Sequence, residues 1–242
     1  MTAGQQVTIS VVSHRQNALV NQLLADLAQH CASHISIVVT INFQDEVELA
    51  ARGLPFPAEV IVNAVPKGFG ANHNAAFGRC RTPSFCVVNP DIRVASNPFS
   101  TLLANFQATD IAVVGPLVRS PLGGTEDSAR RFPTLMSLLR KAAVRNAAPD
   151  YPSDKGPLVV DWIAGMFMLF RSADYRAIGG FDERYFLYYE DADICRRLVR
   201  QGKRVIYDPQ VAIVHDARRA SRRDARLAAH HLASMLRFLA RS

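Results

Sequence analysis

Apolar residues in the first part of the chain alternate between short continuous runs and runs with helical spacing. Residues 7–12 are mostly β-branched, and apolar residues then recur every three or four positions as far as Cys31. The next run, at 35–41, is almost continuously apolar, which is typical of a strand covered on both faces. The chain is therefore predicted to begin with a strand, a helix and a second strand.

This alternation continues into the middle of the chain. Short strands are predicted at 60–63, 85–88 and 111–116, and an alanine-rich segment that ends near Cys80 is predicted to be helical. Strands that alternate with helices favour an α/β fold with a mostly parallel central sheet and helices on both faces. Ligands of such sheets bind beyond the carboxyl ends of the strands.

The second half of the chain is less regular. We expect a polar loop at 119–131 and a basic amphipathic helix at 137–148. A linker at 149–157 and a further helix at 194–199 follow. Two strands are then predicted, at 204–207 and 211–214, separated by Asp208 and Pro209. The second of them would deliver His215 at a strand end.

The last segment, 221–242, has the pattern of a basic amphipathic helix. Its apolar face comprises Ala228, Leu232, Met235, Leu236 and Leu239. From His215 onward, seven arginines against two aspartates contribute +5 (7 − 2) of the net charge of +7. Such a helix suits an anionic membrane surface, but a helix that docks its apolar face on the domain is an equally good interpretation. We expect a domain at 1–216 and a helical appendage at 217–242.

Composition narrows the class of protein and its cellular location. The 242 residues suffice for one large α/β domain with a hydrophobic core, and the net charge of +7 predicts attraction to anions. The four cysteines lack metal-ligand spacing, and the chain shows neither a long apolar run nor a signal-peptide pattern. We expect a cytoplasmic protein, with peripheral contact with the inner face of the membrane as an additional expectation.

Three acidic residues, Glu190, Asp191 and Asp193, lie within four positions directly after a run of aromatic residues. Crowded, desolvated carboxylates are costly, so a bound cation or a proton-transfer task is one explanation. The other explanation is a helix start, where acidic side chains meet the positive end of the helix dipole. The cluster alone leaves both open.

A second acidic position follows the strand predicted at 85–88. There Asn89, Pro90 and Asp91 form a turn at the strand end, and one carboxylate together with substrate phosphates is a usual way to hold Mg²⁺ or Mn²⁺. The same tripeptide is also ordinary turn chemistry. His215, at another strand end, could be a metal ligand or a hydrogen-bond donor to a phosphate, although a single histidine is more often structural.

The segment from Lys67 to Asn74 is a glycine-containing turn that opens the alanine-rich helix. Glycines let the backbone approach a phosphate or nucleotide closely. The segment matches neither the dinucleotide fingerprint nor the phosphate-binding P-loop, and in isolation a tight turn with asparagine caps explains it better.

Together, the order and spacing of these motifs resemble the inverting, nucleotide-sugar-dependent family 2 glycosyltransferases of the GT-A type, particularly rhamnosyltransferase-like members. The resemblance covers roughly 7–216. The stretches that carry it are 7–13, Lys67–Asn74, Asn89–Asp91, Asp161–Gly165, Gly179–Asp193 and His215.

The resemblance implies an enzyme that moves a sugar from a dTDP- or UDP-sugar donor to a saccharide or lipid-linked acceptor. A carboxylate takes the proton of the attacking hydroxyl, and Mg²⁺ or Mn²⁺ stabilises the departing diphosphate. Asp191 would be the catalytic base, with Glu190 as its nearest rival. Trp162 and Gly165 would shape the acceptor side.

The remaining site residues also follow from the resemblance. Asp91 stands at the last position of the D-x-D metal motif, where Asn89 replaces the first aspartate, and His215 would share the metal with Asp91. Many relatives carry an acidic residue near Asn42. The nucleotide side would comprise Ser13, Asn42, Lys67, Gly68, Asn72, Asn74 and Asn89.

Two further hypotheses remain at this point. A sugar nucleotidyltransferase also joins a parallel sheet to a metal and a nucleotide, but the first predicted strand is not followed by a glycine-rich activation loop with arginine and lysine. A basic nucleic-acid-binding module is the non-enzyme alternative. The chain lacks the interleaved aromatic and basic residues of single-strand binders, so we expect no nucleic-acid partner.

Overall fold

The computed structural model describes residues 6–134, 136, 149–216 and 225–241. The helix predicted at 137–148 lies outside these residues. No helix among them is both long and apolar enough to cross a membrane.

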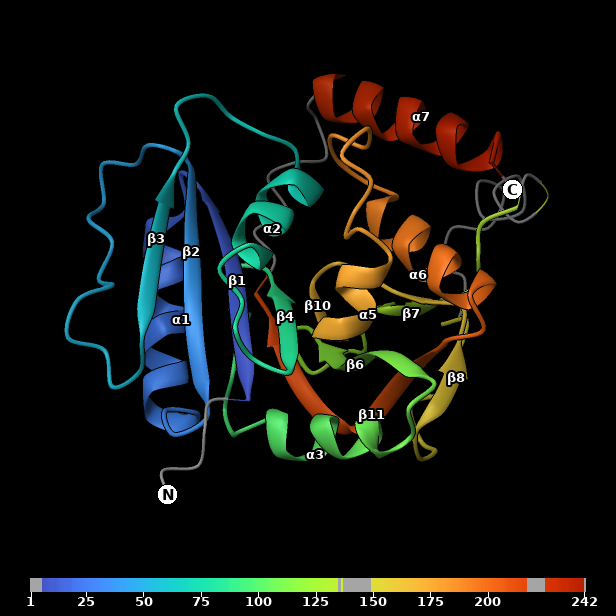
Figure 1. The fold of residues 1–242 in the computed structure, drawn as a ribbon, viewed down its shortest axis with the longest axis horizontal. Coiled ribbons are helices and arrows are strands. Elements are labelled where there is room, and N and C mark those ends of the chain that lie inside the picture. The colour runs from blue at the N-terminus through green and yellow to red at the C-terminus, as the bar shows by residue number, and fades with distance from the viewer. Residues whose placement is uncertain (1–5, 135, 137–148, 217–224, 242) are drawn as a thin grey trace.

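A nine-stranded sheet forms the centre of the molecule (Figure 1). Its order is β3-β2-β1-β4-β10-β6-β11-β5, and β8 pairs with β11 beside this path. A two-stranded sheet, β7 with β9, lies apart from it. The strands are β1 (Val7–His14), β2 (Ile35–Phe43), β3 (Ala58–Val62), β4 (Ser84–Val88), β5 (Ile92–Arg93), β6 (Ile111–Arg119), β7 (Ala129–Arg130), β8 (Leu158–Val160), β9 (Trp162–Ile163), β10 (Phe167–Arg171) and β11 (Arg204–His215).

The body of the sheet is parallel. Strand β1 pairs in parallel with β2 and β4, β2 with β3, and β6 with β11. Strand β10 runs antiparallel between β4 and β6, and the two short strands β5 and β8 run antiparallel to β11. The predicted α/β fold with a mostly parallel sheet is confirmed.

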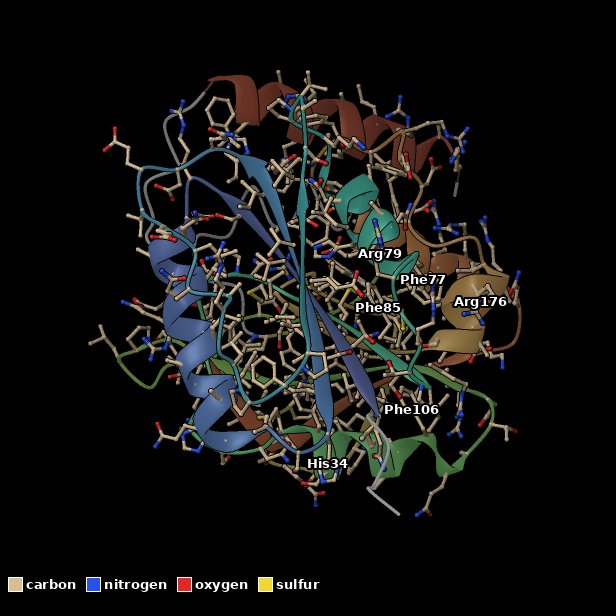
Figure 2. The ribbon with its side chains drawn as sticks, turned by 60° about the vertical axis from the view of Figure 1, so that its left-hand side comes forward. His34, Phe77, Arg79, Phe85, Phe106 and Arg176 are labelled. Carbon is tan, nitrogen blue, oxygen red and sulfur yellow. The ribbon has the colours of Figure 1, made fainter. Side chains whose placement is uncertain are left out.

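Helices cover both faces of this sheet, as predicted (Figure 1). On one face, the leucines of α1 pack with the apolar side chains of β1 and β2 and with those of α3. On the other face, α2, α5 and α6 share a second cluster with β4 and β10, in which Phe77 and Phe85 lie close together (Figure 2), with ring centroids 5.1 Å apart. The helices are α1 (Asn17–His30), α2 (Phe69–Phe77), α3 (Phe99–Ala104), α5 (Ser172–Ala177), α6 (Glu190–Arg200), the 3₁₀ turn η1 (Asn105–Gln107) and α7 (Ala225–Leu239).

The prediction of two separate strands at the end of the domain is wrong, because both fall in a single strand, β11. Its pairing with β6 shifts register between Asp208 and Ala212, which is where Pro209 lies. A register shift accommodates a proline that cannot donate to the ladder. The carboxylate of Asp208 accepts a hydrogen bond from the Asn105 amide at 2.8 Å, so this irregular point is tied to η1.

Helix α7 packs on the domain, but unlike the docked helix considered above it leaves part of its predicted apolar face exposed. Phe238 is buried in the same cluster as the apolar residues of α6, while Leu232 and Leu236 on the predicted apolar face are 53% and 57% exposed. The division of the chain at residue 216 stays a prediction.

Close packing of β6 gives a test of the fold. A Cβ atom added at Gly115 would overlap Ile163 Cγ2, which is buried in β9. We expect Gly115→Ala to lower the free energy of unfolding by about 1–3 kcal/mol, because an overpacked core must shift. Gly156→Ala, whose Cβ would meet no atom within 4 Å, is the control. Equal urea midpoints for the two variants would contradict this packing.

Candidate active site

The carboxyl ends of the parallel strands bring several predicted residues to one edge of the sheet. Ser13 lies at the end of β1, Asn42 near the end of β2, and Asn89 directly after β4. The buried Ser13 hydroxyl donates a 2.5 Å hydrogen bond to Asn17 Oδ1, at the first turn of α1. This edge is where ligands of open α/β sheets bind.

Asn42 and Asn72 belong to a network of side-chain amides. The Asn63 amide donates to Asn42 Oδ1 at 2.9 Å and to Asn72 Oδ1 at 2.6 Å. Asn42 in turn exchanges two hydrogen bonds with the backbone of Lys67, at 2.7 and 2.9 Å. The network fixes the backbone of the turn before α2 and leaves the Lys67 side chain exposed.

Gly68 stands where α2 meets the segment before α6. The N–H of Phe69 donates to the carbonyl of Phe186 at 2.9 Å, and a Cβ on Gly68 would lie 2.7 Å from that same oxygen. A side chain at Gly68 would push the two segments apart. The predicted turn therefore touches the acidic region of the chain directly.

Asn74 has a different environment from Asn72. Its Oδ1 accepts from the Tyr175 hydroxyl at 2.7 Å and from the Phe181 N–H at 2.9 Å. Its amide donates to the Phe181 carbonyl and to Glu183, at 2.9 and 3.0 Å. These bonds hold the segment that leads towards α6, and they engage both the oxygen and the nitrogen of the Asn74 amide within the protein.

Asp91 and His215 lie together, as predicted, and Glu126 joins them. The His215 ring nitrogens lie 3.2 Å from Asp91 Oδ2 and 2.7 Å from Glu126 Oε2. Burial lowers the pKa of His215, but the hydrogen bonds to the two carboxylates outweigh it and raise the pKa to about 9. The ring is therefore a cation near neutral pH in this arrangement.

Asp91 also fits the role of a metal ligand. Its Oδ1 atom is buried and has no hydrogen-bond partner, which is costly unless a cation or other donor reaches it. In the part of the chain that the structure describes, no group of three or more His, Cys, Asp or Glu side chains is arranged to hold a metal ion, and Asp91 and Glu126 meet different nitrogens of the His215 ring. A single carboxylate fits an ion that shares substrate phosphates, rather than one held in a cage of protein ligands.

Asp191 is held by the backbone at the other end of the site. Its Oδ2 accepts the N–H of Gly165 at 2.9 Å, and its Oδ1 accepts the N–H of Ala192 at 2.8 Å. The carbonyl of the next residue, Met166, accepts the N–H of Asn89 at 2.9 Å. One dipeptide therefore connects the acidic start of α6 to the strand end that carries Asp91.

Glu190 and Asp191 both have raised pKa values. Burial raises the pKa of Glu190 well above its ordinary value, and the neighbouring Asp191 charge adds to this. Burial also raises the pKa of Asp191, although the backbone hydrogen bonds and the charge of Arg130 work against it. Asp193 differs, because it forms an ion pair with Arg197 at 2.7 Å. The acidic cluster is therefore a helix start, and two of its three carboxyls have raised pKa values.

The backbone before these carboxylates is strained. Tyr188 and Tyr189 have φ values of 70° and 66°, in the left-handed region that residues other than glycine rarely adopt. Each such residue costs roughly 1–3 kcal/mol, and this kind of strain is concentrated at active sites. It brings the chain sharply into α6, where Glu190 is the first residue.

Trp162 is largely buried in β9, and its indole N–H donates to the Arg131 carbonyl at 3.0 Å. The guanidinium of Arg130 lies 5.2 Å from the indole ring centroid. Gly165 is confined as well, because an added Cβ would lie 3.2 Å from the Phe69 ring. Gly165 therefore lies beside Asp191, and Arg130, which lies near the Trp162 ring, also acts on the charge of Asp191.

The structure adds three residues to those predicted: Asn63, Glu126 and Arg130. Asn63 follows β3 directly, so its place at a strand end was a usable signal. Glu126 and Arg130 lie in the stretch predicted as a polar loop. Only the fold brings that stretch to β9 and β11.

The buried Glu190 carboxyl gives a pH-dependent test. Because its folded pKa is raised, its stabilising contribution is present at low pH and is lost as the pH rises. Between the unfolded and folded pKa, the wild type should lose about 1.4 kcal/mol per pH unit relative to Glu190→Gln. Urea unfolding over a pH series measures this difference. The exposed Glu46→Gln is the control, and parallel wild-type and Glu190→Gln curves would contradict the raised pKa.

Comparison with known proteins gives consistent results. The chain is 30% identical over 247 residues to the rhamnosyltransferase WbbL of Escherichia coli, covering 97% of this chain and 93% of that protein. It is 32% identical over 169 residues to an N-acetylglucosaminyl-diphospho-decaprenol L-rhamnosyltransferase of Mycobacterium tuberculosis. That match covers 64% of this chain and 54% of the relative, so the chain spans only about half the length of the mycobacterial protein.

Solved structures agree with the fold. The mannosyltransferase PcManGT of Pyrobaculum calidifontis, in complex with GDP-Man and Mn²⁺, superposes with a TM-score of 0.68 at 15% identity, covering 100% of this chain and 66% of that one. GalNAc-T7, with UDP, GalNAc and Mn²⁺, gives 0.71 at 12% identity, covering 98% and 48%. The family model described as glycosyltransferase like family 2 matches residues 4–232, and the chain belongs to this glycosyltransferase family.

Proposed function

We propose that this glycosyltransferase moves a sugar, with rhamnose as the first candidate, from a nucleoside-diphosphate donor to a lipid-linked saccharide, with inversion at the anomeric carbon. The observation that carries the proposal is the link through Gly165 and Met166 between Asp191 and Asn89. This link supports the proposal that a base and a diphosphate-binding position belong to one site. The rhamnosyltransferase names of the two relatives support the choice of sugar.

Asp191 is the proposed catalytic base. A sugar hydroxyl is a weak nucleophile near neutral pH, so a carboxylate that takes its proton during attack speeds the reaction. Burial raises the proton affinity of Asp191, and two backbone N–H groups fix its orientation. Burial and the neighbouring Asp191 charge raise the pKa of Glu190 well above its ordinary value, which favours its protonated form and makes it less suited to be the base.

The donor nucleotide is proposed to lie along the edge formed by Ser13, the Asn42–Asn63–Asn72 network and Asn89. Lys67 and Gly68 border this edge on the α2 side. Lys67 and Arg130 offer positive charge to a diphosphate. Asn74 is left out of the nucleotide side because its amide is fully used in holding Phe181 and Glu183.

Asp91 is the proposed protein ligand of a divalent ion, with His215 beside it. Bound Mg²⁺ or Mn²⁺ would stabilise the negative charge that develops on the leaving diphosphate. The unpartnered Oδ1 of Asp91 supports this role. His215 Nε2 holds the other carboxylate oxygen of Asp91, and Glu126 holds the opposite ring nitrogen of His215, so we propose that His215 positions Asp91 and that Glu126 acts through His215.

The acceptor is proposed to enter on the side of Trp162, Gly165 and the two strained tyrosines. Aromatic faces suit sugar rings, and water excluded by them keeps the base in a low-dielectric setting. The decaprenol-linked substrate in the name of the mycobacterial relative supports a lipid-linked acceptor. We accordingly propose that the chain works at the cytoplasmic face of a membrane.

The choice between the two carboxylates can be tested directly. Asp191→Asn should lower kcat by roughly a hundred- to ten-thousand-fold while donor binding persists, because only the proton transfer is lost. Glu190→Gln should keep substantial activity. The measurement is sugar transfer from dTDP-rhamnose and UDP-sugars to a prenyl-diphosphate-linked N-acetylglucosamine. Inactive Glu190→Gln alongside active Asp191→Asn would move the base to Glu190.

The diphosphate site has its own test in calorimetric titrations with dTDP, UDP and GDP, with and without Mn²⁺ or Mg²⁺. We expect one nucleotide to bind in a metal-dependent manner, and Asp91→Asn to weaken that binding at least about tenfold, because a charged ligand is lost. Asp110→Asn removes an exposed carboxylate paired with Arg204 and is the control. Metal-independent binding of equal strength in both variants would contradict the role of Asp91.

A further inference from the structure

Helix α7 contacts the active-site segment through its polar side. The Ser234 hydroxyl donates to the Leu187 carbonyl at 2.8 Å, and the His230 ring stacks on Phe186 at a centroid distance of 4.8 Å. The His231 ring lies 5.2 and 5.3 Å from the rings of Tyr188 and Tyr189. The helix therefore rests on the segment that leads into Glu190 and Asp191.

The C-terminal end of α7 is tied down by charge and by one buried ring. Phe238 is buried, and the Arg196 guanidinium lies 3.6 Å from its ring centroid. Arg241 forms an ion pair with Asp182 at 2.6 Å, and Arg237 donates to the Arg184 carbonyl. These contacts fix which face of the helix points away from the domain.

The outward face is apolar. Leu232 and Leu236 are 53% and 57% exposed, and they are flanked by small exposed residues. At 3.6 residues per turn, all of these positions fall on one side of the helix. The small exposed residues are Ala228, Ala229, Ala233 and Ala240. In Figure 1, α7 lies along the outside of the molecule, above α6.

Charge indicates what covers this face. From His215 onward the sequence carries seven arginines against two aspartates, the greater part of the net charge of the chain. Four of these arginines precede α7 in the sequence and Arg226 lies in its first turn, so the sequence joins a run of basic residues to an amphipathic helix. This combination is typical of helices that lie in the interface of an anionic bilayer. Arg200, whose guanidinium donates to the Arg241 carbonyl, adds positive charge at the C-terminal end.

A second copy of the chain is a weaker match to the same face. A helix of 15 residues is about 22 Å long, and a stripe about 10 Å wide along it covers roughly 220 Å². A stable dimer buries about 800 Å² on each partner. The face is therefore small for a dimer, whereas a bilayer needs only a few inserted apolar side chains.

We propose that the outward face of α7 is a membrane-binding surface, and that the helix holds the Tyr188–Asp191 segment at the surface of an anionic bilayer. The inference rests on the proposed function only for the nature of the acceptor, which would reach the site from the lipid side. One face of α7 would then contact the bilayer, and the other face would contact the active-site segment.

The test is sedimentation of the full chain with vesicles of phosphatidylcholine and phosphatidylglycerol, compared with phosphatidylcholine alone. We expect binding to the anionic vesicles, and at least about a tenfold loss of partitioning in the double variant Leu232→Glu/Leu236→Glu. Val159→Glu on β8, where the side chain is 56% exposed, is the matched control and should bind as the wild type does. Circular dichroism and dTDP titration of each variant establish that the fold and the nucleotide site are intact.

Three outcomes would overturn the membrane surface. They are absence of vesicle binding by the wild type, equal binding by the double variant, and a wild-type dimer in light scattering that the double variant converts to a monomer without any vesicle binding. Failure of the proposed function looks different. If no nucleotide binds while vesicle binding depends on Leu232 and Leu236, the surface stands and the donor assignment falls.

Discussion

The hydrogen bond from the Gly165 N–H to the Asp191 carboxylate is the contact on which the site depends. It joins the sheet, through Met166 and Asn89, to the first turn of α6. Space at position 165 is tight, because an added Cβ would lie 3.2 Å from the Phe69 ring, which would have to shift by a few tenths of an ångström. Phe69 opens α2, so one small residue sets the spacing among the sheet, α2 and α6.

Much of the sheet was predictable from the sequence, because its parallel strands are continuously apolar and are separated by helical patterns. The antiparallel strand β10 was not predicted, since the apolar run from 160 to 170 has no period that distinguishes a strand's direction or neighbours. Strand β11 was predicted as two strands because Asp208 and Pro209 are ordinary breakers, and only the sheet shows that the ladder continues past them.

The sequence predicted the types of residue that form the site, but not what each of them contacts. Asn72 and Asn74 stand two positions apart in the same turn and helix, yet Asn72 joins the network at the strand ends and Asn74 holds Phe181. Their partners come from distant parts of the chain, which no local pattern displays. Glu126 was overlooked for the same reason. Family membership, by contrast, decides against the nucleotidyltransferase and nucleic-acid hypotheses.

The left-handed backbone at Tyr188 and Tyr189 has a consequence for engineering. Glycine would adopt these φ values with less strain, so a search for stabilising substitutions would select it at both positions. The tyrosine rings, however, meet His231, and that of Tyr189 also meets Phe238, so glycine would remove the contacts that seat α7. Local backbone preference and helix docking therefore oppose each other here, and a more heat-resistant version of this enzyme is better sought elsewhere in the chain.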